Sequence, residues 1–408
     1  MVLLVAMAVL FCVFTVNRIF SRKDSYPPGP PGLPLVGNLF DLPKDYAWIA
    51  LTRYGKKYGD LVHLNVLGQH IIVINSYRAA VEMLDRKGSI YSDRPTFVMG
   101  SELCGYTKTL PLTPYGQRTR TMRRLMHKFM GTGGVVQRFD DVLQEEVQRL
   151  MTRILRDPRE EHLEGHLTDT TGAILLRLAY GVSAREENDP YLLRARSVMK
   201  QFFKAIEPGA FLVDTIPWLR YIPWWMPGSG FLKTAAEWRE NYYKLADEPM
   251  LEAQQKTPNS FVAQTVQNDV SEDEQEMLKF TAATIFAGML ARFIRRIKLD
   301  DVFDCKRMPF VNAVVTEVLR WNVVGPLGVP HQVIQNDVQD GYVIPKGTTI
   351  LANIYCMLSD EELYPNPQQF DPSRFLPDDV RPLQRDPRDV AFGFGRRHAL
   401  SICLTLGC

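Results

Sequence analysis

The stretch PFVNAVVTEVLRW, residues 309–321, carries an acidic residue inside an apolar helical pattern. At about 3.6 residues per turn, one stripe of this helix surrounds Glu317 and contains Phe310, Val314 and Trp321. A buried carboxylate is costly unless it is paired, and Arg320, three positions on, flanks the same face. An exposed ion pair on an amphipathic helix is the alternative, but the apolar neighbours favour burial. We therefore expect a buried Glu317–Arg320 ion pair, which needs a large core around it.

The chain is long enough to build such a core. It has 408 residues, of which 46% are hydrophobic and 23% charged, as is ordinary for a globular protein. Helical patterns dominate from about residue 115 to 205 and from about 272 to 321. Two stretches predict β-hairpins: residues 60–76, turning at Gly68, and residues 340–357, turning at Lys346 and Gly347. The expected fold class is mainly α with small β-sheets.

The N-terminal segment has a long uncharged run. Residues 1–16 carry no charge, and Arg18, Arg22 and Lys23 follow directly. The run is short against the roughly 20 residues that span a bilayer, but a thin membrane such as that of the endoplasmic reticulum tolerates the mismatch. A cleaved signal peptide is the alternative. We expect a single membrane anchor at residues 1–20, with the bulk of the chain in the cytosol by the positive-inside rule.

A proline-rich hinge follows the predicted anchor. Residues 21–32 end in YPPGPPG, whose four prolines favour an extended, stiff segment. One domain is expected from residue 33 to residue 408. Within it, residues 207–231 gather four aromatic side chains among prolines: Trp218, Tyr221, Trp224 and Trp225. They predict either the buried core of a loop or a surface at the level of lipid headgroups, where such rings are enriched.

Charge and cysteine content exclude several classes of protein. The net charge of +2 argues against nucleic acid as the main partner. The six cysteines are scattered without a CxxC pair. This spacing favours a reducing compartment over a disulfide framework or a structural zinc site.

Residues 115–130, YGQRTRTMRRLMHKFM, predict an amphipathic helix with a basic face. Its apolar face holds Met122, Leu125, Met126 and Phe129. Its opposite face holds Arg120, Arg124, His127 and Lys128, and a basic run of this kind is by itself a solvated surface. Arg123 lies at the border, where a guanidinium reaches inward from a buried stem and offers a fork of donors to an anionic group.

Three motifs follow one another along the chain: EVLR at 317–320, FDPSRF at 370–375 and AFGFGRR at 391–397. In this order and setting they resemble those of the haem-thiolate monooxygenases, the cytochrome P450 family. The anchor, the hinge, YSDRP at 91–95 and GPLGVPH at 325–331 are similar to those of membrane-bound fungal members. The resemblance covers nearly the whole chain.

The resemblance implies haem as the cofactor and gives several residues a role. Three residues match contacts to the haem propionates: Arg123, His331 and Arg397. Three others match the family's buried network on the haem side: Glu317, Arg320 and Arg374. Thr119 stands where the family usually has an aromatic side chain beside a propionate.

The resemblance also implies an activity and partners. The family inserts one atom of dioxygen into a small apolar substrate, with electrons from an NADPH-dependent reductase. The basic face of residues 115–130 suits docking of such an acidic electron donor, through Arg120, Arg124 and Lys128. The endoplasmic reticulum membrane is the expected location.

The chain departs from the family in the haem-ligand loop, which reads FxxGxxxCxG. Counting from Phe392, Ala399 holds the place of the cysteine. A thiolate ligand pushes electron density onto the iron and favours O–O cleavage, and alanine cannot supply it. Cys403 and His398 are neighbouring alternatives, although a cysteine among apolar residues is usually a small buried hydrophobe.

A second departure lies in residues 279–306. FAG at 286–288 resembles the start of the oxygen-activating helix, but Leu290 and Ala291 occupy the places of its acid and threonine. We also expect the domain to be truncated at its C-terminus. No catalytic or metal-ligating residue is therefore assigned. The alternative to a monooxygenase is a non-catalytic remnant or mis-spliced gene product, tethered to a membrane without productive haem binding.

Overall fold

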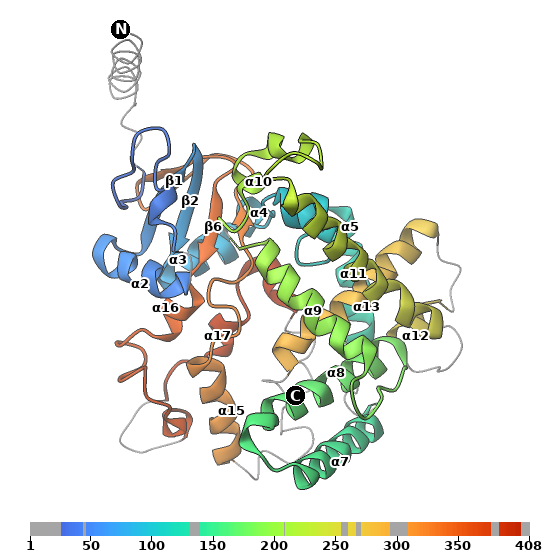
Figure 1. Ribbon diagram of the computed structural model, residues 1–408. Helices are drawn as coiled ribbons and strands as arrows, with labels where there is room; N and C mark the ends of the chain where they lie inside the picture. The colour runs from blue at the N-terminus through green and yellow to red at the C-terminus, as the bar shows by residue number, and fades with distance from the viewer. Residues whose placement is uncertain are drawn as a thin grey trace.

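The computed structural model describes most of the chain (Figure 1). The described residues are 26–43, 46–130, 139–207, 209–253, 260–266, 271–293, 309–376 and 383–400. The predicted anchor at residues 1–20 lies outside them, as do residues 401–408. In the described ranges, no helix has both the length and the apolar composition that crossing a membrane requires.

Helices make up most of the described chain, as the sequence predicts. The long helices are α2 (Ala47–Tyr58), α5 (Gln117–Met130), α7 (Asp140–Arg156), α8 (Glu160–Tyr180), α9 (Pro190–Ala205), α11 (Gly230–Ala253), α13 (Glu272–Phe293) and α15 (Pro309–Trp321). The short ones are α3 (Tyr77–Ala80), α4 (Gly88–Tyr91), α10 (Leu212–Thr215), α12 (Phe261–Val266), α16 (Ile354–Leu358) and α17 (Arg388–Ala391). Tighter or wider helical turns are η1 (Leu39–Asp41), η2 (Val81–Arg86), η3 (Val98–Leu103), η4 (Tyr106–Lys108), η5 (Pro217–Tyr221), η7 (Pro372–Phe375) and η8 (Gly395–Leu400).

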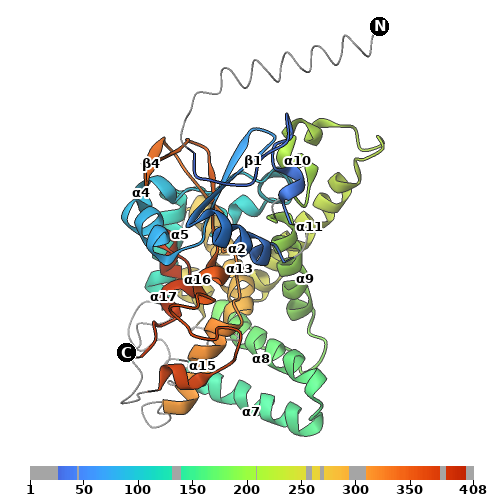
Figure 2. The same ribbon diagram turned by 90° about the vertical axis from the view of Figure 1, so that its left-hand side faces the viewer.

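Helix α13 forms the centre of the helical part of the molecule (Figures 1 and 2). Helix α8 runs against it, and α5, α9, α11 and α12 pack around it. The C-terminal half of α8 is buried on nearly all sides, as expected for an interior helix. Tyr180 of α8 meets Phe286 of α13 edge to face, with ring centroids 6.1 Å apart. Burial of such large side chains is the main stabilising contribution in this part of the fold.

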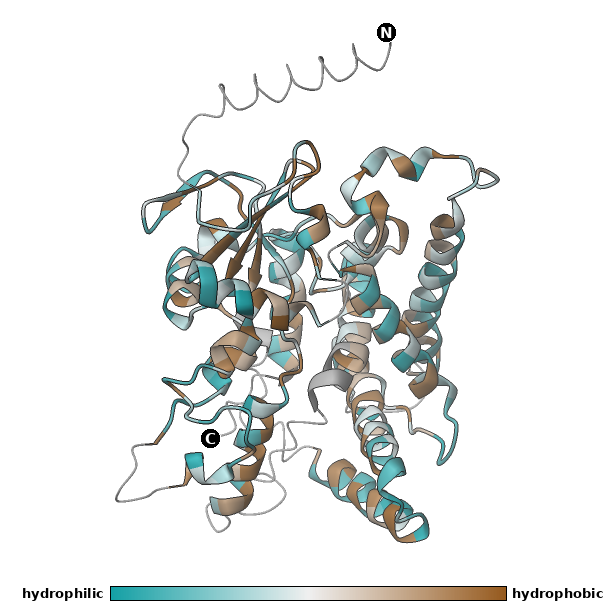
Figure 3. Cartoon of the chain, turned by 60° about the vertical axis from the view of Figure 1, so that its left-hand side comes forward, coloured by the Kyte–Doolittle hydropathy of each residue, from teal (hydrophilic) through white to brown (hydrophobic). Residues whose placement is uncertain are grey.

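A four-stranded sheet in the order β1-β2-β6-β3 forms the other part. Its strands are β1 (Leu61–Val66), β2 (Gln69–Ile74), β6 (Thr349–Ala352) and β3 (His331–Gln332). The predicted hairpin over residues 60–76 is confirmed: β1 and β2 are antiparallel and turn at Leu67 and Gly68, whose φ values are 50° and 86°. Strand β2 then pairs in parallel with β6. Figure 3 shows these strands as largely hydrophobic.

The predicted hairpin over residues 340–357 is wrong. Strand β5 (Tyr342–Ile344) pairs instead with β4 (Asp337–Gln339) in a separate two-stranded sheet. That hairpin turns at Asp340 and Gly341, with φ values of 51° and 80°. The turn at Gly347 carries the chain into β6 and the larger sheet. Strand β6 prefers the larger sheet because its apolar residues are buried there beside β2.

The proline-rich hinge is described from residue 26, and its end lies against β1. The His63 N–H donates to the Pro28 carbonyl oxygen at 3.0 Å. A side chain at Gly29 would place its Cβ 2.0 Å from the His63 carbonyl oxygen. Glycine is therefore required for this close approach of the two backbones.

The four aromatic side chains singled out within residues 207–231 are exposed, so the first of the two predicted alternatives, a buried loop core, is wrong for them. The exposed fractions are 64% for Trp218, 74% for Tyr221, 83% for Trp224 and 67% for Trp225. We call these four residues the aromatic surface. The short helix α10 that precedes it contacts the β1–β2 hairpin, because Gln69 Nε2 donates to the Asp214 carbonyl oxygen at 3.4 Å. Figures 1 and 2 show α10 and this hairpin at the same end of the molecule.

Candidate functional site

A buried ion pair lies on α15. The side chains of Glu317 and Arg320 are 0% and 1% exposed. Arg320 Nη2 and Nε each donate to one carboxylate oxygen of Glu317, both at 2.7 Å. This two-pronged geometry is the strong form of an arginine–carboxylate contact. Arg320 Nη1 also donates to the Leu358 carbonyl oxygen at 3.1 Å, which ties α15 to α16.

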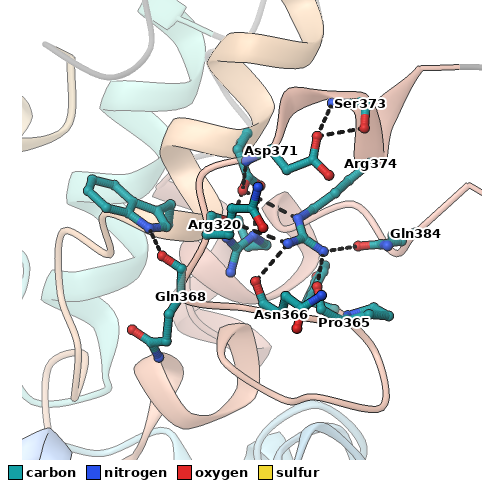
Figure 4. A network of polar contacts seen from close by, with 12 residues as sticks. Arg320, Pro365, Asn366, Gln368, Asp371, Ser373, Arg374 and Gln384 are labelled. Atoms are coloured by element: carbon teal, nitrogen blue, oxygen red, sulfur yellow. Dashed lines mark hydrogen bonds and ion pairs between the residues drawn. The ribbon is translucent and has the colours of Figure 1, made fainter.

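The segment FDPSRF brings a third charge to this pair (Figure 4). Arg374 Nε lies 3.4 Å from Glu317 Oε1, and Arg374 Nη2 donates to the Asn366 carbonyl oxygen at 2.9 Å. The Asp371 N–H donates to the same Glu317 oxygen at 2.9 Å. The structure thus brings together all three residues of the predicted network, with one carboxylate between two guanidinium groups.

The apolar stripe predicted on α15 is not what buries Glu317. Phe310 and Trp321 are 59% and 49% exposed. The buried face holds Ala313, Thr316, Glu317, Leu319 and Arg320. Trp321 instead donates from its indole nitrogen to the Gln368 carbonyl oxygen at 2.8 Å. The helix therefore turns its charged residues inward, because Arg374 and main-chain groups satisfy them there.

Arg397 lies at the centre of a second buried site, in the FGFGRR segment. Arg397 is buried, with 7% of the residue exposed. Nε donates to the Ser92 carbonyl oxygen at 2.9 Å, Nη2 to that of Thr113 at 2.8 Å and Nη1 to that of Leu110 at 3.4 Å. Arg397 thereby joins η8 to the two loops on either side of η3 and η4.

The two other predicted propionate contacts lie beside Arg397. Arg123 of α5 donates from Nη1 to the Arg396 carbonyl oxygen. His331 of β3 is buried, and its Nδ1 lies 2.8 Å from the Tyr91 carbonyl oxygen. A carbonyl only accepts, so Nδ1 carries the proton. Burial, with the positive charges of Arg94 and Arg397, lowers the pKa of His331 well below its usual value. The ring is therefore neutral.

Arg94 of YSDRP is a member of this site that the sequence did not single out. It is 7% exposed. Its Nε donates to the Pro111 carbonyl oxygen at 2.8 Å, and its Nη1 to the carbonyl oxygens of Val329 and Pro330 at 2.7 and 2.6 Å. The available signal was the position of an arginine inside YSDRP, a motif that already carried the family resemblance. We call the three cations Arg94, Arg123 and Arg397, together with the neutral ring of His331 beside them, the cationic cluster.

The cationic cluster fits the anionic edge of a haem group. Burial and the neighbouring charge of Arg123 lower the pKa of Arg397 to about 10, against a smaller opposing effect of Asp93. The direction of the shift follows first from the poor solvation of the guanidinium and second from its repulsion by Arg123. An anionic group placed among the cations relieves this repulsion, and two carboxylates fit a site with two buried arginines, Arg94 and Arg397, and the half-buried Arg123.

The position that holds the axial ligand in the family offers no donor atom for the iron. In the described part of the chain, no group of three or more histidine, cysteine or acidic residues is arranged to hold a metal ion. Ala399 holds the cysteine's place in η8, and an alanine side chain has no donor atom. The alternative ligand Cys403, with Cys408, lies outside the described residues, as does the side chain of His398. The chain therefore fits the carboxylate edge of haem, whereas the family's ligand position, Ala399, carries no donor atom.

The start of the predicted oxygen-activating helix is buried next to the cationic cluster. It lies in α13, whose residues Phe280 to Ala287 are buried. Thr284 Oγ1 donates to the Phe280 carbonyl oxygen at 2.7 Å and accepts from the Leu110 N–H at 3.4 Å. Leu110 also receives a hydrogen bond from Arg397, so a single residue connects α13 to the cluster. The side chains of Leu290 and Ala291 lie outside the described part of the chain.

Comparisons with known proteins agree with these features. The family model for cytochrome P450 matches residues 27–294 and 290–400. Cytochrome P450 monooxygenase 208 of Postia placenta is 35% identical, over 97% of this chain and 83% of the relative. Cytochrome P450 monooxygenase claR of Ampulloclitocybe clavipes is 34% identical, over 95% and 78%. Tryptamine 4-monooxygenase of Psilocybe cyanescens is 31% identical, over 99% and 87%. Both the family model and these relatives cover most of the sequence, and the chain belongs to the cytochrome P450 family.

Proposed function

We propose that this chain binds haem through the cationic cluster, which holds the two propionates, while the Glu317 network supports the fold beside them. Family membership implies haem as the cofactor. The observation that carries the assignment is the gathering of buried positive charge around Arg397, whose described hydrogen bonds reach only neutral carbonyl oxygens. Arg94 and Arg123 add the guanidinium groups that a pair of carboxylates needs.

We further propose that the chain holds haem by its edge and does not support thiolate-driven monooxygenation. In the family, haem with an axial thiolate supplies dioxygen activation. Ala399 occupies the position of the axial ligand. This supports the proposal, because an alanine side chain has no atom that can bind iron. The second candidate function is the monooxygenase activity of the family, supported by the names of the relatives. It requires an axial ligand from elsewhere, and Cys403 is the nearest thiol in sequence.

A carbon monoxide difference spectrum separates these two functions. We expect the full chain, loaded with haem and reduced, to lack the band of a thiolate-ligated, carbon monoxide-bound haem. The variant Ala399→Cys is expected to gain that band. Cys403→Ser is the matched control, because it removes a thiol from the same segment. A thiolate band in the unsubstituted chain that disappears in Cys403→Ser would establish the second candidate.

Membrane association is proposed through the aromatic surface together with the predicted anchor, with the bulk of the chain in the cytosol. The exposure of Trp224 and Trp225 supports this, because tryptophan rings favour the headgroup level. Vesicles with brominated lipids should quench the tryptophan fluorescence of the full chain. The double variant Trp224→Ser, Trp225→Ser should lose most of that quenching, whereas Trp321→Phe, on the distant helix α15, should retain it. Equal quenching in all three proteins would show that the aromatic surface does not contact the membrane.

A reductase is proposed as the redox partner, docking on the basic face of α5. The exposed side chains of Arg120, Arg124 and Lys128 support this, since long-range charge complementarity steers such encounters. Charge reversal by Arg124→Glu should weaken binding of the reductase several-fold at low salt. Lys233→Glu, an equal change at an 85% exposed side chain of α11, should leave binding unchanged.

A further inference from the structure

Tyr115, just before α5, is the aromatic residue that lies against the arginines of the FGFGRR segment. The guanidinium carbon of Arg396 is 5.5 Å from the centre of its ring, and that of Arg397 is 5.6 Å away. Arg396 Nη1 also lies 3.4 Å from the Tyr115 hydroxyl oxygen, which accepts its hydrogen bond. One ring thus contacts two consecutive cations, and the negative face of an aromatic ring attracts both.

The backbone of Tyr115 is held by a contact of its own. Its backbone N–H donates to Asp93 Oδ1 at 2.9 Å. Asp93 precedes Arg94 of the cationic cluster, so this hydrogen bond joins Tyr115 to the loop that carries Arg94. The backbone around Tyr115 is tied to a second member of that site as well, because Thr113 accepts a hydrogen bond from Arg397 at 2.8 Å.

Thr119, one helical turn after Tyr115, does not take part in these contacts. Its side chain is fully buried, and its Oγ1 donates to the Pro114 carbonyl oxygen at 2.5 Å. This is the place where the resemblance leads one to expect an aromatic side chain. The contacts with Arg396 and Arg397 therefore come from a residue four positions earlier.

We propose that Tyr115 is a positioning residue, which holds Arg396 and Arg397 in the arrangement that receives a haem carboxylate. This inference rests on the proposed haem function of the cationic cluster. Two adjacent arginines repel each other and have many rotamers, and an aromatic ring in contact with both reduces these two penalties before the ligand arrives. The Tyr115 hydroxyl orients Arg396, and the ring orients Arg397.

The test compares two probes, haemin and haemin dimethyl ester, which differ only in the charge of the two carboxyl groups. Affinities of the full chain for both are measured by absorption and by quenching of tryptophan fluorescence. The ratio of the two affinities reports the carboxylate site, and a general loss of folding lowers both affinities alike. Four proteins are compared: the unsubstituted chain, Tyr115→Leu, Tyr115→Phe and the control Tyr58→Leu. Tyr58 also carries a cation on its ring, Lys57 at 5.0 Å, but in α2.

The unsubstituted chain is expected to prefer haemin over the ester. Tyr115→Leu should reduce this preference about tenfold, as expected for loss of a partly desolvated cation–π contact. Tyr115→Phe should retain most of it, because the ring remains, and Tyr58→Leu should retain all of it. A full preference in Tyr115→Leu would overturn the role of Tyr115 alone. Equal affinities of the unsubstituted chain for the two probes would overturn the proposed carboxylate site, and the role of Tyr115 with it.

Discussion

Two regions of the molecule bury arginine side chains, and they treat the buried charge in opposite ways. In the network around Glu317, a carboxylate lies between Arg320 and Arg374 at 2.7 and 3.4 Å. In the cationic cluster, Arg397 donates to three carbonyl oxygens, and burial, together with the nearby charge of Arg123, lowers its pKa.

The difference separates a structural site from a binding site. A closed network pairs its charges within the chain. Removing one partner leaves the others buried without a counter-charge, at a large desolvation cost. A cluster in which positive charges outnumber the neighbouring carboxylate of Asp93 keeps part of its electrostatic potential for a ligand of the opposite sign. The first region should therefore respond to mutation through stability, and the second through ligand affinity.

The largest effect is expected from Glu317→Gln, which keeps the shape of the side chain and removes its charge. Arg320 and Arg374 then remain buried without a counter-charge, and the free energy of unfolding should fall by about 3–5 kcal/mol. Urea unfolding measures this loss. The control is Glu361→Gln, which breaks a pair with Lys56 whose two side chains are both 72% exposed, and it should change stability little. Equal effects of the two substitutions would contradict the closed network.

A smaller effect on stability is expected from Arg397→Met than from Arg320→Met. Arg397 loses hydrogen bonds to neutral oxygens and relieves repulsion, so the loss should be about 1–3 kcal/mol, below that of Arg320→Met. Haemin affinity should show the reverse order, with a fall of roughly tenfold or more for Arg397→Met. Unfolding curves and haemin titrations of both variants test the comparison. A larger loss of haemin affinity in Arg320→Met would reverse the assignment of the two regions.

The pH dependence of the ligand-free chain should report His331. Its pKa is lowered in the folded state, so the unfolded state takes up the proton first as the pH falls. This contribution to stability is complete above the ordinary histidine pKa of about 6.5 and is lost below it, with a slope of at most about 1.4 kcal/mol per pH unit.

The variant His331→Gln isolates this contribution, because His63 and His70 have lowered pKa values as well. Between about pH 7 and pH 5, the stability of the variant should fall less steeply than that of the unsubstituted chain. Bound haemin should also flatten the slope of the unsubstituted chain, since carboxylates favour a protonated His331. Parallel curves for the two proteins would show that the ring is not desolvated as described.

The smallest effect is expected from salt, and it should differ between the regions. Raising the ionic strength from about 0.05 to 0.5 M should weaken haemin binding a few-fold. The added salt screens the attraction of the haemin carboxylates to the cluster and to exposed Arg396. The stability difference between the unsubstituted chain and Glu317→Gln should stay nearly constant, since buried pairs are screened much less. A strong salt dependence of that difference would indicate that water reaches Glu317.

Local features of the site were predictable from sequence, and contacts between distant segments were not. Arg320 was identified as the partner of Glu317 because residues three apart share a helix face. The prediction that Phe310 and Trp321 share the buried face with Glu317 was wrong. Which face of α15 is buried depends on Arg374 and the main chain near Asp371, which contact Glu317. Arg94 was missed for the same reason: its acceptors, Pro111, Val329 and Pro330, are brought to it only by the fold.

The β-structure shows the same division. The β1–β2 hairpin was predictable because its two-residue turn at Gly68 is encoded locally. The partner of β6 was not predictable. Ile350 of β6 lies opposite Ile72 of β2, and the sequence of neither strand identifies the other as its partner. For the cofactor, motifs indicated the family, whereas the gathering of one sign of charge around Arg397 emerged only from the folded arrangement.

The parallel pairing of β2 with β6 also has a consequence for biosynthesis. On the ribosome, β2 emerges long before β6, which lies far along the chain, so at common rates of translation β2 waits on the order of tens of seconds for its neighbour. During that time the apolar edge of β2 is an open template for pairing with other chains. Nascent chains of this protein should therefore depend on chaperones at the hairpin, and crowded expression should favour aggregation that begins at residues 69–74.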